Sequence, residues 1–137
     1  MSDFFTAMEV SASGLSVERT RMNVAASNLA NAATTRAAGG GPYKRKDVVV
    51  QSAPVANAPA GVSGVQVASI KPDAAPPRME HDPGHPDADA NGYVAYPNVN
   101  PVEEMVDMIT ASRAYEAGVT ALTAAVSMAE SALGIGR

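Results

Sequence analysis

The residues best suited to chemistry lie in one short segment, residues 79–89, where two histidines stand among four carboxylates. His81 and His85 have the spacing that places two imidazoles on one face of a helical zinc site. A Pro-Gly pair lies between them, however, and another proline follows, so this segment cannot form a helix. The carboxylates are Glu80, Asp82, Asp87 and Asp89.

The same segment has only part of the spacing of a calcium loop. Asp87, Asp89 and Gly92 fit the beginning of such a loop, but the position of its bidentate acid is occupied by Asn98. An acidic, solvated turn is the simpler interpretation. We therefore expect no metal and no cofactor.

Other candidate chemistry is equally weak. The basic triplet 44–46 could touch an anion, but charges that begin a strand more often mark an exposed edge. The glycine run 39–41 lacks the Lys-Ser/Thr of a phosphate loop, so we interpret it as a hinge. The chain has no Cys, which excludes thiol catalysis, and no Ser–His–acid pattern stands out. We expect no enzyme activity.

Composition points to a chain that depends on partners. Its 137 residues suit one domain, and alanine supplies much of the 46% hydrophobic content. Because there is no Trp and only two Phe, the chain can bury only a modest core. The net charge of −4 argues against nucleic acid as the main ligand. Charge is also uneven, with +3 in residues 1–78 and −7 in residues 79–137.

Both ends of the chain carry apolar residues at seven-residue intervals, which is typical of a helical seam. This repeat predicts helices over residues 4–29 and 101–133, paired as a coiled coil. An ordinary helical hairpin is the alternative, but the narrow seam and the many small flanking residues favour packing between chains. The expected seam residues are Phe5, Met8, Leu15, Met22, Leu29, Met105, Met108, Val119, Leu122, Val126 and Leu133.

The second helix has a clear start. Asn100 is a suitable N-cap, Pro101 suits the first helical position, and Glu103 completes a capping box. Gly118, in the middle of this helix, is a weak point.

All prolines lie between Pro42 and Pro101, so the middle of the chain is not helical. Residues 43–52, 61–70 and 93–96 are predicted as strands, Asn91-Gly92 as a tight turn, and residues 72–86 as irregular. The expected class is α+β. It comprises an axial helix with its Asn/Thr-rich end (residues 1–36), a small β unit (37–99) and a second axial helix (100–137).

Several segments together resemble the flagellar rod and hook axial proteins, and in particular the proximal rod proteins. The first runs from Ser11 to Thr35 and includes the motif residues Asn28, Leu29, Ala30, Asn31, Thr34 and Thr35. The others are residues 40–49, 82–88, 92–94, 96–105 and 111–117. The resemblance covers nearly the whole chain except about residues 51–79.

The resemblance implies a structural subunit of the proximal rod, the drive shaft that crosses the periplasm. It implies export by the flagellar type III apparatus and polymerisation through the terminal helices. Implied partners are copies of the chain, the rod proteins FlgB, FlgF and FlgG, and the MS-ring junction protein FliE. From the residues alone we expect no cleavable signal peptide, no membrane span and no nucleic-acid partner. A cytoplasmic helical scaffold unconnected with export is the alternative, and a metal-dependent enzyme is a more distant one.

Overall fold

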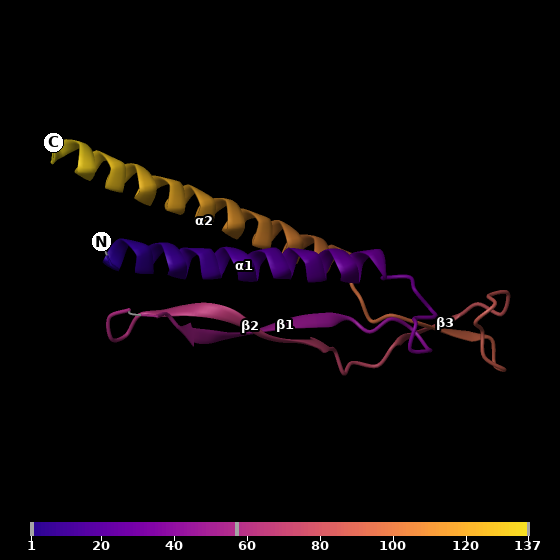
Figure 1. Cartoon of the computed structure of the whole chain (residues 1–137). Helices are drawn as coiled ribbons and strands as arrows, with labels where there is room; N and C mark the ends of the chain where they lie inside the picture. Colours follow the sequence, from indigo (N-terminus) through magenta and orange to yellow (C-terminus); the bar gives the residue numbers. More distant parts are fainter. Residues whose placement is uncertain (1, 57, 137) are drawn as a thin grey trace.

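The computed structural model describes residues 2–56 and 58–136. Figure 1 shows α1 lying between α2 on one side and the β1–β2 hairpin on the other, with β3 at the end of the molecule away from the two termini. The α+β class is confirmed. The elements are α1 (Ser2–Ala30), β1 (Lys46–Pro54), β2 (Ser63–Pro72), β3 (Arg78–His81), β4 (Tyr93–Tyr96) and α2 (Pro101–Ile135).

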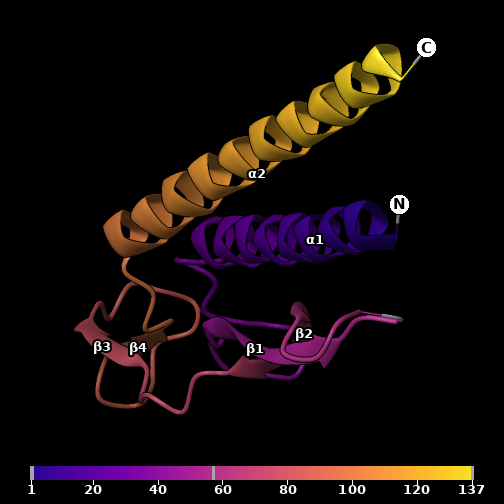
Figure 2. The ribbon, with the colours of Figure 1, turned by 90° about the vertical axis from the view of Figure 1, so that its left-hand side faces the viewer.

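The two helices run antiparallel and separate toward the chain ends, as Figures 1 and 2 both show. They meet at Gly118, where a Cβ would lie 2.7 Å from Leu15 Cδ2. The predicted weak point is thus a contact point between the helices. The splayed arrangement does not establish a coiled coil, which stays a prediction.

The start of α2 follows the sequence expectation closely. Asn100 is the N-cap and Pro101 begins the helix. The cap's Oδ1 accepts a hydrogen bond from the amide of Val102 at 3.1 Å, two residues on, and not from the amide of Glu103 as a capping box would require.

Two separate antiparallel hairpins make up the middle of the chain. β1 pairs with β2, with an irregularity between Val49 and Val50, and β3 pairs with β4. Residues 72–86 were expected to be irregular, and this expectation is wrong for residues 78–81, which form β3. These residues form a strand without a long apolar run because β4 supplies their hydrogen-bonding partners. The predicted turn is present, since Gly92 has a φ of 78° and its amide donates to the carbonyl of Asp89.

β2 packs closely on α1 through small residues. The amide of Val65 donates to Ser13 Oγ at 3.1 Å, and a Cβ on Gly64 would lie 2.9 Å from the same oxygen. The contact therefore combines one hydrogen bond with a close backbone approach.

The hydrophobic core is small, as the composition predicted. In the part of the chain described, the buried hydrophobic residues are Val17, Ala25, Val94, Val99 and Ala111. α2 has 35 residues, of which only Glu104 and Ala111 are buried.

By length and composition alone α2 could cross a membrane, because an 18-residue window has a mean hydropathy of 1.3, and none of that window is buried in the chain. This finding corrects the sequence-based expectation that no stretch approaches a membrane span. A helix with this composition also suits packing against other helices, because its apolar content is largely Ala and Val.

Candidate functional site: a buried polar cluster and the exposed faces of the helices

Asn28, near the end of α1, fastens that helix to the first strand. It is 1% exposed, and its side chain makes two hydrogen bonds with the backbone of Lys46. Nδ2 donates to the Lys46 carbonyl and Oδ1 accepts from the Lys46 amide, both at 2.9 Å. Oδ1 also accepts from the hydroxyl of Tyr43 at 2.9 Å.

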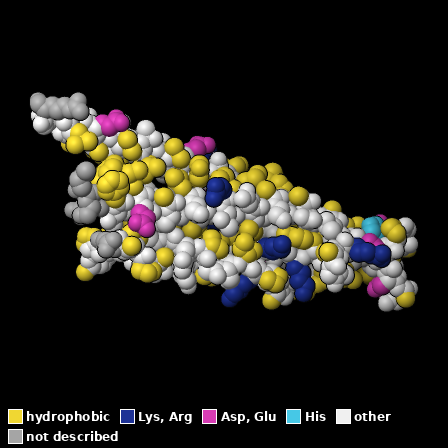
Figure 3. Space-filling view, viewed as in Figure 1, with side chains coloured by type: hydrophobic (Ala, Val, Ile, Leu, Met, Phe, Trp, Pro, Cys, Tyr) yellow, Lys and Arg dark blue, Asp and Glu magenta, His cyan; other side chains and the backbone are white. Residues whose placement is uncertain are grey.

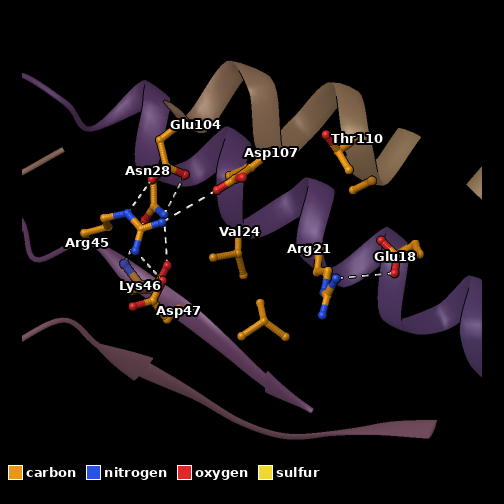
Figure 4. Close-up of a pocket in the computed structure, with 13 residues that line it drawn as sticks. Glu18, Arg21, Val24, Asn28, Arg45, Lys46, Asp47, Glu104, Asp107 and Thr110 are labelled. Carbon is orange, nitrogen blue, oxygen red and sulfur yellow. Dashed lines mark hydrogen bonds and ion pairs between the residues drawn. The ribbon is translucent and has the colours of Figure 1, made fainter. Parts of the chain in front are cut away.

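The second Nδ2 hydrogen bond of Asn28 reaches Glu104 Oε2, on α2, at 3.0 Å. All four hydrogen-bonding positions of this amide are therefore used. One side chain thus joins both helices to the start of β1, as Figure 4 shows.

Glu104 is a carboxylate with only 1% exposure, and burial of an unpaired charge would be costly. Its Oε1 accepts from Arg45 Nε at 2.5 Å, so the charge is paired. The same guanidinium contacts Asp47, and it lies 3.7 Å from Asp107 and 4.0 Å from Asp73. We call Asn28, Arg45 and Glu104 the polar cluster.

Two opposing effects act on the guanidinium of the polar cluster. Burial acts to lower the pKa of Arg45, but the hydrogen bond and charge of Glu104, together with Asp47, outweigh it. The pKa is therefore raised above its ordinary value, and Arg45 stays charged throughout the physiological range.

An open pocket of about 270 Å³ lies beside the polar cluster, between α1, α2 and β1. Its lining mixes carboxylates and basic groups such as Glu18, Arg21 and Asp107. In the described part of the chain, no group of three or more His, Cys, Asp or Glu side chains could hold a metal ion. The charged side chains around the pocket form ion pairs, and the pairs with Arg45 connect α2 to the start of β1.

The other residues of the Asn/Thr motif connect the end of α1 to its surroundings. Asn31 Nδ2 donates to the Ser27 carbonyl, and Thr34 Oγ1 donates to Asn31 Oδ1. Thr35 Oγ1 donates to Asp87 Oδ2 at 2.8 Å, and Asp87 also pairs with Arg36 at 2.5 Å. Leu29 is half-buried and Ala30 exposed. Asp87, considered above as a metal ligand, thus holds the loop before β4 to the end of α1.

The two histidines of the acidic segment have partners of their own. His81 packs edge-on against Tyr93, with ring centroids 5.1 Å apart. His85 Nδ1 accepts from the amide of Asp87 at 3.0 Å. The imidazole ring of His85 therefore accepts a hydrogen bond from the backbone two residues later, which closes a tight turn.

The expected seam residues divide into two groups in the single chain. Phe5, Met105, Val119 and Leu133 are exposed, with Leu133 at 66%. The half-buried members are Met8, Leu15, Met22, Leu29, Met108, Leu122 and Val126.

A further exposed apolar surface lies near the start of α2, and of its residues the seven-residue repeat singled out only Met105. Val102, Val106 and Ile109 are 63%, 55% and 52% exposed, and Met105 adjoins them. We call these four residues the outer patch. Figure 3 shows hydrophobic side chains along much of α2 on the face in view.

Sequence reasoning missed the polar cluster as a unit. Asn28 was noticed only as part of a motif, and Arg45 only as one of three basic residues near the start of a strand. One pattern in the sequence could have indicated that Glu104 is buried. Glu104 begins a helical row whose successive members lie three or four residues apart, so its carboxylate falls on the same face as these residues: Met108, Ala111, Tyr115, Gly118 and Leu122.

Comparison with known proteins defines the class first. A family described as flagella basal body rod protein matches residues 8–37, and one described as flagellar basal body rod FlgEFG protein C-terminal matches residues 90–135. These matches cover most of both helices and include Asn28 and Glu104 of the polar cluster, while Arg45 lies between the two matched ranges.

Full-length relatives narrow the class to one protein family. The chain is 44% identical to the flagellar basal-body rod protein FlgC of Borreliella burgdorferi, over 96% of both chains. It is 43% identical to FlgC of Bacillus subtilis, over 97% of this chain and 98% of the relative. It is 44% identical to FlgC of Salmonella typhimurium, over 94% and 95%. The chain belongs to the FlgC family of flagellar basal-body rod proteins, and it is a structural protein and not an enzyme.

Proposed function

We propose that this rod subunit polymerises through its two helices, which pair with helices of neighbouring subunits, and that it reaches its place in the periplasm through the flagellar type III apparatus. Its partners in this proposal are copies of itself, FlgB, FlgF, FlgG and FliE. Membership of the FlgC family favours this role over a cytoplasmic scaffold.

One observation carries the proposal: a 35-residue helix has only two buried residues, and much of its surface is exposed in the single chain. The outer patch lies near the start of α2, and the exposed seam residues Val119 and Leu133 lie further along it, so neighbours could pack on this helix over much of its length. A polymer needs such heterologous contacts, which repeat without closing.

Interhelical contacts also explain the apolar content of α2. The most apolar stretch of α2 still contains Glu130, whose charge a span of lipid would have to accommodate at considerable cost. Vesicle flotation of the purified chain separates the two interpretations. We expect the chain to remain with the soluble fraction, and stable insertion into vesicles would contradict the proposal.

The proposal is tested by placing charges on the outer patch, with Val106→Lys and Ile109→Lys combined. Both side chains are exposed in the single chain, so we expect the free energy of unfolding to change little. We expect motility to be lost because the lysines would be buried against a neighbouring subunit. The conservative Ile109→Leu variant is the control and should swim. Normal swimming by the double-lysine strain would contradict the proposed contact.

A further inference from the structure

The row of α2 residues that meets Leu15 contains little that distinguishes one register from another. Leu15 of α1 packs against Gly118, and the residues seven positions away on either side are Ala111 and Ala125. A shift of α2 by seven residues, ~10 Å along its axis, would therefore place an alanine where the glycine lies. The end of the leucine side chain can adjust to one added methyl group.

The polar cluster is the feature that such a shift would break. Glu104 belongs to the same row as Ala111 and Gly118, but it alone is charged and buried. After a seven-residue shift, Ala111 would stand opposite Asn28 and Arg45. An amide donor and a guanidinium would then lose their carboxylate. A single polar residue in an otherwise apolar helical seam is known to specify register at some cost in stability.

We propose that Glu104 is a positioning residue that fixes the register of α2 on α1 and β1, through Asn28 and Arg45. In this proposal the polar cluster determines which register forms. Apolar residues of similar size in its place would give the chain a similar free energy of unfolding. The role belongs to the single chain and does not depend on how the subunit meets its neighbours.

The natural chain has no cysteine, so spin labels can be attached at chosen positions without background. Asn23→Cys on α1 and Ala114→Cys on α2 replace residues that are both exposed. Pulsed electron paramagnetic resonance then measures the distance between the helices in the full chain. It is compared between the natural cluster and the double variant Arg45→Met with Glu104→Leu, which leaves the Asn28–Lys46 bonds in place.

We expect one narrow distance distribution with the natural cluster. In the double variant we expect an unchanged or higher melting temperature, and a second population displaced by ~10 Å along the helix axis. The matched control is Asp107→Asn, which removes a 60% exposed carboxylate on the same helix and should leave one population.

Three results would overturn the proposal. A single narrow distribution in the double variant would show that apolar packing sets the register. A broad distribution with the natural cluster would show that the cluster does not fix it. A broad distribution accompanied by a large fall in melting temperature would show that the cluster serves stability alone.

Discussion

Asn28 shows how much one side chain can contribute when its amide is fully used. It contacts the backbone of Lys46, the hydroxyl of Tyr43 and the carboxylate of Glu104, from a position that is almost completely buried. Few other residues of similar size could replace it, because the site requires two donors and two acceptors in one plane.

We expect Asn28→Asp to be strongly destabilising although the side chain keeps its shape. The change removes both donors and places a second carboxylate against Glu104 in a buried site. Disruption of a buried charged network typically costs ~3–5 kcal/mol, and the partial exposure of Arg45 makes the lower end appropriate here. Urea unfolding measures the difference. Asn23→Asp, exposed on the same helix, should change little, and equal midpoints for the two variants would contradict the assigned role of Asn28.

At the scale of elements, the sequence predicts local structure better than it predicts contacts. The cap at Asn100, the turn at Gly92 and both long helices follow from residue types and spacing, and the structure confirms them. β3 was missed because its four exposed residues carry no periodic signal. The polar cluster was missed because its members are far apart in the sequence, and burial of Glu104 depends on how α2 docks.

Gly118 illustrates the same distinction. Glycine is unfavourable within a helix, but its small size suits the contact with Leu15. We expect Gly118→Val to destabilise the chain, by the ~1–3 kcal/mol typical of overpacking, because its branched side chain would meet Leu15. Adding Leu15→Ala should recover part of this loss, so the two changes should not be additive in thermal unfolding. Full additivity would show that the two positions do not share a contact.

At the scale of the whole molecule, the small core and the separated helix ends imply uneven stability. In the isolated subunit we expect amides of residues 119–135 to exchange with solvent rapidly. We expect those of residues 104–118, which lie near the cluster and Leu15, to exchange more slowly. Amide exchange on the monomer measures both sets. Strong protection along the whole of α2 would contradict this expectation.

Export is also a property of the whole chain, and we expect the first helix to carry the signal. The chain buries only a small hydrophobic core, so α1 can unfold readily before it enters the export channel. Removal of residues 2–28 should leave the protein inside the cell, in a strain with an intact apparatus and no native copy. The same segment should carry an inert passenger out. Efficient secretion of the shortened chain would place the signal elsewhere, and residues 39–50 would then be the next segment to delete.

The central claim is that neighbouring subunits of a rod cover the apolar surface that α2 leaves exposed. A density map of the intact flagellar basal body, at a resolution that shows side chains, tests it most directly. We predict that α1 and α2 lie within the rod and that the outer patch, around Val106 and Ile109, packs against a helix of another subunit. A map in which the outer patch faces solvent, or in which this chain lies outside the rod, would contradict the claim.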